Sequence, residues 1–195
     1  GLTGNSSYSY EASDNITGSW TDWVSRLYSH KKTRAICDYF VKESHYNVFV
    51  YEHYTGIPAS TKILLKKEIG RGGSKKQHID YKIAIDDVRT YLQNNYVYSE
   101  HFSRLADNRD FAGNFVKMRK GCDVHYATMA TLIFRYYGIP ARYVEGYMIT
   151  PGDLKGKKAG AVISVKESRI HAWTEIYIDG YGWVPVEVTP EYYGV

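Results

Sequence analysis

The sequence predicts an α+β fold, with helices in the first two thirds of the chain and an antiparallel sheet in the last third. Apolar residues recur at helical spacing in several stretches before residue 138, whereas short β-rich runs separated by turn residues follow residue 140. The chain has 195 residues, of which 44% are hydrophobic and 24% charged. A chain of this length can bury a sizeable core, so we expect one main domain with an extension.

The first half of the chain is expected to be helical. Residues 1–18 are rich in Ser, Asn and Tyr without periodicity, which is typical of a poorly ordered arm. Apolar spacing predicts helices over 20–27, 33–42, 60–69 (capped by Ser60) and 79–95, with a short β-rich run over 47–51. Cys37 is expected to be a small buried hydrophobe. We therefore divide the chain into an arm (1–18), a helical N-terminal extension (19–78) and a core (79–195).

The core is expected to be built on one central helix. Residues 124–137 are apolar nearly all round, which predicts a buried helix that ends at Gly138 and Pro140. A mobile basic loop is expected over 154–160. Strands are predicted over 142–149, 161–165, 172–178 and 183–188.

Composition argues against several classes of function. The net charge of +4 is too mild to indicate a nucleic-acid partner, and the basic residues between 62 and 76 have acidic neighbours, as on a solvated face. No apolar run approaches the roughly 18 residues of a membrane helix, so this chain itself is expected to make no membrane contact. The two cysteines, Cys37 and Cys122, do not form a disulfide scaffold, and no Gly-x-Ser-x-Gly motif indicates a serine hydrolase.

Cys122 is the first candidate for chemistry, because it stands at the start of the predicted central helix. The partial positive charge and unpaired N–H groups of a helix N-terminus favour thiolate over thiol and can bind an oxyanion. Gly121 before it would let the backbone turn tightly and let a substrate come close. The alternative, a buried structural cysteine, stays open on position alone.

His171 and Glu187 are the candidate partners of Cys122. His171 opens a predicted strand and could serve as a base, while Trp173 on the same strand face could shield a thiolate–imidazolium pair from water. Glu187 interrupts an apolar strand, where a carboxylate is costly without a partner, and it could orient the imidazole of His171. The two share a sheet face only if the hairpin loop is odd or bulged. A three-residue loop over 179–181 meets this condition.

Taken together, the motifs resemble the transglutaminase-like superfamily over about residues 80–195. They are Gly121-Cys122, Arg135-Tyr136-Tyr137-Gly138-Ile139-Pro140-Ala141-Arg142-Tyr143-Val144-x-Gly146-Tyr147, His171-Ala172-Trp173-x-Glu175 and Gly182-Trp183-x-Pro185-x-Glu187-x-Thr189-Pro190. The resemblance implies a papain-like fold, with the cysteine-bearing helix packed on an antiparallel sheet. It also implies a Cys122–His171–Glu187 triad, in which Glu stands where the family more commonly has Asp. An aromatic oxyanion donor upstream of the cysteine is implied as well, for which Tyr98 or Tyr96 is the candidate.

The reaction implied by the resemblance is acyl transfer through a thioester on Cys122, and it requires no cofactor. Members of the bacterial branch are commonly described as cysteine proteases, which favours hydrolysis over transfer to a lysine amine. Expected substrates are proteins or peptides, with cell-wall peptides among the candidates. The expected location is outside the cytoplasm or at the cell surface, within a larger membrane-anchored or secreted parent.

Two alternatives to the enzyme interpretation remain. One is a catalytically silent domain of the same fold that acts as a binding module at the cell surface, although the intact Cys122, His171 and Glu187 argue against it. The other is a metal site built on Cys122-x-x-His125. Because zinc sites usually need two close ligand pairs and no second pair is convincing, we expect no metal, and we expect His125 to pack against the surroundings of its helix.

Overall fold

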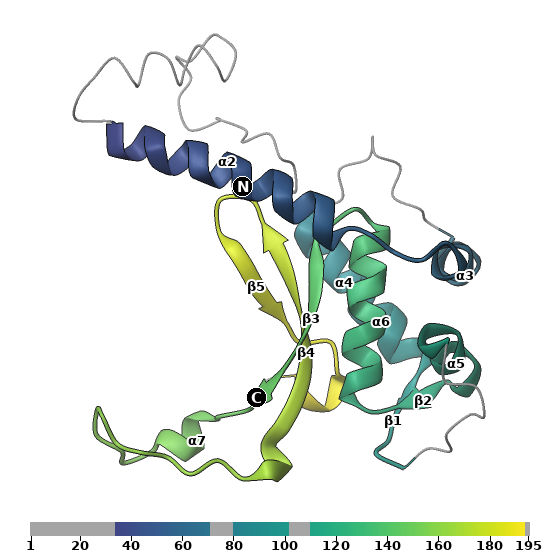
Figure 1. The fold of residues 1–195 in the computed structure, drawn as a ribbon. Coiled ribbons are helices and arrows are strands. Elements are labelled where there is room, and N and C mark those ends of the chain that lie inside the picture. The colour runs from purple at the N-terminus through teal and green to yellow at the C-terminus, as the bar shows by residue number, and fades with distance from the viewer. Residues whose placement is uncertain (1–33, 71–79, 102–109, 194–195) are drawn as a thin grey trace.

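The helices precede the sheet along the chain, which confirms the predicted α+β class (Figure 1). The computed structural model describes residues 34–70, 80–101 and 110–193. The larger helices are α2 (Arg34–Tyr54), α3 (Ala59–Ile69), α4 (Tyr81–Asn95), α5 (Phe111–Met118) and α6 (Asp123–Tyr136). None of the helices in these ranges combines the length and apolarity needed to span a membrane.

The main sheet has three antiparallel strands in the order β3-β4-β5. They are β3 (Ala141–Tyr147), β4 (Ile170–Ile178) and β5 (Gly182–Val186). A second, parallel pair consists of β1 (Val97–Tyr98) and β2 (Lys120–Gly121), and it immediately precedes α6. The two sheets therefore meet the central helix at different places: the three-stranded sheet packs along it, and the small pair leads into its N-terminus (Figure 1).

Helix α6 is the centre of the core, as its apolar composition predicts. It lies between the three-stranded sheet and helices α3, α4 and α5 (Figure 1). Ile133 and Phe134 on the helix and Ile176 on β4 are all fully buried. Burial of each such side chain stabilises the fold by roughly 1.5–3 kcal/mol. The buried hydroxyl of Thr174 on β4 donates to the carbonyl of Ala127 on α6 at 2.8 Å, so this polar group keeps a hydrogen bond inside the core.

Both ends of α6 follow from the sequence. The helix ends at Tyr136, and Gly138 adopts a left-handed φ of 81°, which glycine reaches without a Cβ clash. It begins at Asp123, one residue before the expected start, with Cys122 as the N-cap. Cys122 is therefore held by the first turn of the most buried helix of the core.

The N-terminal helices differ from the expectations in two places. The predicted β-rich run over 47–51 is wrong, because α2 continues through it to Tyr54. Its β-branched and aromatic residues take helical geometry because α2 packs against the β4–β5 hairpin: Tyr177 donates to Glu43 at 2.6 Å, and Trp183 donates to the hydroxyl of Tyr46 at 3.0 Å. Ser60 does not cap α3, since the helix begins at Ala59 with Pro58 as its N-cap.

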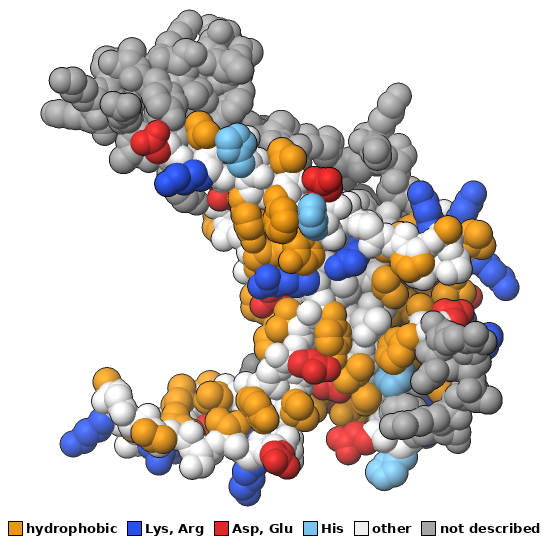
Figure 2. Space-filling view, viewed as in Figure 1, with side chains coloured by type: hydrophobic (Ala, Val, Ile, Leu, Met, Phe, Trp, Pro, Cys, Tyr) orange, Lys and Arg blue, Asp and Glu red, His pale blue; other side chains and the backbone are white. Residues whose placement is uncertain are grey.

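The predicted strand over 161–165 is also absent. Strands β3 and β4 pair with each other up to Tyr147 and Ile170, so the segment between them leaves the sheet and finds no partner strand. It contains the short helix α7 (Pro151–Leu154) and a 3₁₀ turn over 167–169. Figure 1 shows this segment as an arm that projects from the sheet, and Figure 2 shows a hollowed face between it and α2.

Some expectations fall outside the described residues. They are the arm over 1–18 and the helix over 20–27. The expected burial of Cys37 falls there too, because the structure describes the backbone of α2 at that position but not the side chain.

Candidate active site

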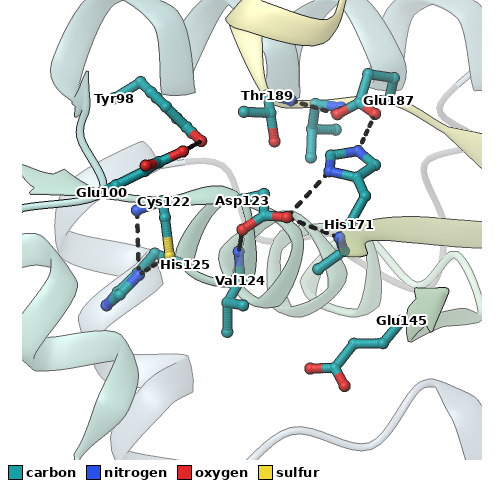
Figure 3. Close-up of polar contacts among 12 residues, drawn as sticks. Tyr98, Glu100, Cys122, Asp123, Val124, His125, Glu145, His171, Glu187 and Thr189 are labelled. Carbon is teal, nitrogen blue, oxygen red and sulfur yellow. Dashed lines mark hydrogen bonds and ion pairs between the residues drawn. The ribbon is translucent and has the colours of Figure 1, made fainter. Parts of the chain in front are cut away.

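Cys122 is positioned by the small parallel sheet and by α6. The backbone N–H of Ser99 donates to the carbonyl of Gly121 at 2.8 Å, and Tyr98 lies opposite Gly121 in the strand pair. Helix α6 begins immediately afterwards, so the half-buried thiol sits beside the backbone N–H groups of the first turn (Figure 3).

Gly121 is needed for a close contact rather than for a turn. Its φ is not in the left-handed region. A Cβ at this position would lie 2.6 Å from Cγ of His125, far inside van der Waals contact. The expectation of a tight backbone turn at Gly121 is therefore replaced by a packing requirement: the ring of His125 occupies the space that a side chain would fill.

His125 is the immediate neighbour of the thiol. Its Nδ1 lies 3.5 Å from Sγ of Cys122 and accepts the Cys122 backbone N–H at 3.3 Å. The ring is buried and stacks on Phe111, with centroids 4.8 Å apart, so the expectation that His125 packs against the surroundings of its helix is confirmed. Burial lowers the pKa of His125, which leaves a neutral ring whose Nδ1 is an acceptor for the thiol.

Opposing influences act on the pKa of the Cys122 thiol. Burial raises it most, and the nearby Asp123 carboxylate raises it further. The backbone N–H groups of Val124 and His125 act in the other direction, as expected at a helix N-terminus. The net pKa is raised, so in this arrangement Cys122 is a thiol, and the helix N-terminus alone does not make it a thiolate.

His171 and Glu187 form the contact that the sequence predicts. Nε2 of His171 lies 2.6 Å from Oε2 of Glu187, and the imidazole is 5% exposed. The other carboxylate oxygen accepts the N–H groups of Val188 and Thr189 at 2.9 and 2.8 Å. Ile178 pairs with Gly182, which leaves the predicted three-residue loop over 179–181 and places His171 and Glu187 on one face.

Asp123 is a site residue that the sequence analysis missed. Its Oδ2 lies 3.0 Å from Nδ1 of His171 and also accepts the N–H of Ala172 at 2.8 Å. Its Oδ1 accepts the N–H of Val124 at 2.8 Å. An acidic residue in the first turn of a helix is common because it complements the helix dipole, so the sequence offers no signal that distinguishes Asp123.

The two carboxylates make His171 basic. Burial lowers the pKa of His171, but the hydrogen bonds to Asp123 and Glu187, together with their charges, outweigh burial and raise the pKa to about 9. Burial raises the pKa of Asp123, yet the bonds from His171, Ala172 and Val124 bring it below its usual value. At neutral pH the site therefore holds an imidazolium between two carboxylates.

The structure thus brings together His171 and Glu187 but gives Cys122 a different partner. The thiol contacts His125, whereas both ring nitrogens of His171 are bound to carboxylates (Figure 3). Among the described residues, no hydrogen bond joins the thiol to His171.

The candidate oxyanion donors lie in different environments. Tyr96 is buried, and its hydroxyl lies 2.9 Å from that of Tyr91, so it faces the core. The hydroxyl of Tyr98 lies beside the site, 3.4 Å from Glu100 (Figure 3). Burial and a hydrogen bond with Tyr192 raise the pKa of Tyr98, which keeps its hydroxyl protonated. Tyr98 is therefore the better placed of the two.

Aromatic rings enclose His171. The Trp173 ring is stacked with the imidazole at a centroid distance of 6.2 Å, and it covers Gly146, where a Cβ would come within 2.7 Å of the ring. Tyr192, which the sequence analysis did not single out, lies 4.2 Å from the imidazole centroid on the short turn Pro190–Tyr192. These rings reduce the access of water to the imidazolium and so strengthen its charge interactions.

One alternative to an enzyme site is a metal site built on Cys122 and His125. Within residues 34–70, 80–101 and 110–193, no group of three or more His, Cys, Asp or Glu side chains is arranged to hold a metal ion.

Comparison with known proteins points to one family. A family model described as the transglutaminase-like superfamily matches residues 65–188, which is more than half of the chain. The uncharacterized protein YebA of Bacillus subtilis is 32% identical over 107 residues, which cover 52% of this chain and 14% of YebA. The protein-glutamine gamma-glutamyltransferase of Pseudomonas aeruginosa is 38% identical over 71 residues, which cover 36% of this chain and 10% of that protein.

Among solved structures, the periplasmic domain of TgpA from Pseudomonas aeruginosa aligns with a TM-score of 0.48 and 24% identity. The alignment covers 71% of this chain and 48% of that domain. The matched regions make up 14% of YebA and 10% of the gamma-glutamyltransferase, so this chain spans only a small part of each of these relatives.

Proposed function

Since the chain belongs to the transglutaminase-like superfamily, we propose that this site catalyses thiol-dependent acyl transfer from amides of proteins or peptides. Cys122 is the nucleophile, His171 the base, and Glu187 the residue that orients His171. The observation that carries the proposal is the 2.6 Å contact between His171 and Glu187, because this carboxylate is itself locked by two backbone N–H groups. Such a pair, beside a cysteine at a helix N-terminus, is the arrangement expected for a thiol nucleophile.

The reaction would proceed in two halves. Cys122 gives its proton to solvent, and the resulting thiolate pairs with the Nδ1–H of the His171 imidazolium and attacks the carbonyl carbon of the substrate amide. The C–N bond then breaks, and the departing amine or ammonia takes the proton from His171, which leaves a thioester on Cys122. Water or an amine attacks the thioester, gives a proton to His171 and releases the Cys122 thiolate. Throughout the reaction, Nε2 of His171 keeps its hydrogen bond to Glu187.

The oxyanion of each tetrahedral intermediate needs hydrogen-bond donors. The first-turn N–H groups of α6 lie beside Sγ, and the protonated hydroxyl of Tyr98 is the candidate side-chain donor. The neutral His125 ring packs under the thiol and fixes its direction, while Trp173 and Tyr192 limit access of water to His171.

The second half-reaction divides the candidate functions. We propose hydrolysis as the first candidate, which makes the domain a cysteine protease or amidase that needs no cofactor. Transfer to a lysine amine is the second candidate, and the 38% identity to a protein named as a protein-glutamine gamma-glutamyltransferase favours it. Work outside the cytoplasm, as part of a larger cell-surface protein, stays a prediction, as does action on cell-wall peptides.

The test is to supply glutamine-containing peptides with and without a fluorescent primary amine. Ammonia release, peptide cleavage and amine incorporation are followed together, and intact-mass spectrometry looks for the acyl adduct on Cys122. We expect turnover in the wild type and none in Cys122→Ala, and the ratio of incorporation to hydrolysis assigns the acceptor. Equal turnover by Cys122→Ala would refute the enzyme proposal. Peptide binding without turnover in either protein would favour the silent binding module.

A further inference from the structure

The two ring nitrogens of His171 are not equivalent in the proposed mechanism. Glu187 binds Nε2, so only Nδ1 can pair with Sγ of Cys122. In the structure Nδ1 instead lies 3.0 Å from Oδ2 of Asp123. The nitrogen that the nucleophile needs is occupied by a carboxylate from the residue next to the nucleophile (Figure 3).

We propose that Asp123 is a positioning residue that holds His171 in a resting orientation, and that Nδ1 must pass from Asp123 to Sγ of Cys122 before acyl transfer. This inference rests on the proposed function. The thiol gives its proton to solvent, and the Nδ1–H of His171 exchanges its hydrogen bond to Asp123 for one to the thiolate; the step needs no other reactant.

The contacts around Asp123 support a resting state. Its carboxylate also accepts backbone N–H groups of Val124 and Ala172, so it is fixed to both α6 and β4. The thiol meanwhile lies against the neutral Nδ1 of His125, which can accept the S–H proton but is too poorly basic when buried to hold it. Each member of the reacting pair therefore has a substitute partner in the structure.

The groups that face His171 come from several elements. Asp123 on α6 and Glu187 after β5 bring negative charge, and Tyr192 on the C-terminal turn covers the ring. Burial raises the pKa of Tyr143 on β3 most, the neighbouring Glu145 raises it further, and smaller contributions from Asp123 and Cys122 show that Tyr143 also faces this centre. Of the two carboxylates, only Asp123 competes with the thiol for Nδ1.

The two carboxylates thus predict opposite effects on the thiol. Asp123→Asn leaves only a neutral amide oxygen, a weaker acceptor for Nδ1–H, and removes the negative charge beside Sγ, so the thiolate should form at lower pH. Glu187→Gln removes one negative charge beside Nε2 and leaves Nδ1 bound to Asp123. It should therefore not lower the pH at which the thiolate forms. Glu187→Gln is therefore the matched control.

The experiment measures the rate of Cys122 alkylation by iodoacetamide against pH, by peptide mass spectrometry. We expect the midpoint of the profile to fall by about one pH unit in Asp123→Asn, which is roughly a tenfold higher rate below the midpoint. We expect no fall in Glu187→Gln. A midpoint in Asp123→Asn that is unchanged or higher overturns the inference, because a merely structural Asp123 would not activate the thiol when it is removed.

Double variants identify the base that responds. The gain in Asp123→Asn should disappear when His171→Ala is added and persist when His125→Ala is added; the reverse pattern overturns the inference. If His171→Ala slows alkylation in the wild type while Asp123→Asn gives no gain, the inference fails and the proposed triad survives. If His171→Ala has no effect in either background, the triad fails as well.

A measurement on the wild-type protein needs no substitution. Nitrogen-15 NMR of the His171 ring should show both nitrogens protonated at pH 7.5, because each donates to a carboxylate. A neutral ring with one unprotonated nitrogen at that pH overturns the resting state, whether or not Asp123→Asn folds.

Discussion

The imidazole of His171 donates from Nε2 to a Glu187 carboxylate that cannot turn away without losing two backbone hydrogen bonds. Oε1 of Glu187 accepts from Val188 and Thr189, while Oε2 lies 2.6 Å from His171. A single side chain thus links β4 to the chain that follows β5 and fixes the plane of the ring. Hydrogen bonds to charged groups contribute about 1.5–3 kcal/mol each, so this link is a substantial part of the energy that holds the site.

Replacing Glu187 should lower the basicity of His171. In Glu187→Gln we expect the pKa of His171 to fall from about 9 by roughly one to two units, since the charged hydrogen bond is lost. Nitrogen-15 or proton NMR titration of the ring measures this directly. Glu191→Gln is the control, because Glu191 is an exposed glutamate on the neighbouring turn and should leave the titration unchanged. An unshifted pKa in Glu187→Gln would argue against the pair.

The contact between Gly121 and His125 predicts a steric cost. Gly121→Ala puts a Cβ 2.6 Å from His125, which must shift, and we expect a loss of about 1–3 kcal/mol in the free energy of unfolding in urea. The loss should shrink when His125→Ala is already present, because the colliding ring is gone. Gly56→Ala is a control, since nothing lies within 4 Å of its Cβ. Equal losses in both backgrounds would mean that the ring is not the obstacle.

His171 should make stability depend on pH above neutrality. Its pKa is about 9 in the folded chain and about 6.5 when unfolded, so the folded state binds the extra proton in this range. The contribution is fully present below pH 6.5 and is lost as pH rises through 9. We expect the difference in unfolding free energy between wild type and His171→Gln to fall by about 3 kcal/mol across this window. A difference that stays constant from pH 6 to pH 9.5 would contradict the two-carboxylate environment.

Asp179 should impose a second pH dependence at lower pH. Burial raises the pKa of Asp179 to about 6. A hydrogen bond from Tyr51 on α2 lowers this pKa, and the charge of Glu43, also on α2, raises it further. Because the folded pKa exceeds the usual 3.8, the contribution of Asp179 to stability is present below that value and is lost as pH rises through 6.

The variant Asp179→Asn keeps the shape but cannot ionise, so thermal melting should lose this pH dependence between 4 and 6. Asp86→Asn, at an exposed position on α4, should retain it. If both variants show the pH dependence of the wild type, ionisation of Asp179 is not its cause, and the prediction is wrong.

The parts of the fold that the sequence predicts well are those governed by local pattern. Helix α6 follows from an apolar stretch bounded by Gly138, and the pairing of Ile178 with Gly182 follows from turn residues and strand alternation. The same alternation predicts that His171 and Glu187 share a face only if the hairpin loop is odd or bulged, and the three-residue loop meets this condition. In each case the deciding interaction lies within one element or between neighbours along the chain.

The failures are those in which distant packing decides. Residues 47–51 have strong β propensity, yet α2 is fixed by hydrogen bonds to Tyr177 and Trp183 more than 130 positions away. The run over 161–165 has strand composition but lies in the segment that leaves the sheet between β3 and β4. The contact between Asp123 and His171 depends on how α6 lies across β4, and no local pattern encodes that geometry.

The three-residue loop over 179–181 makes chain length, as well as side-chain identity, a determinant of the site. A deletion or insertion of one residue there would shift the register of β5 and turn Glu187 to the opposite face of the sheet. Point substitutions in the loop leave the register alone. Natural variation at this hairpin should therefore be rich in substitutions and poor in single-residue changes of length.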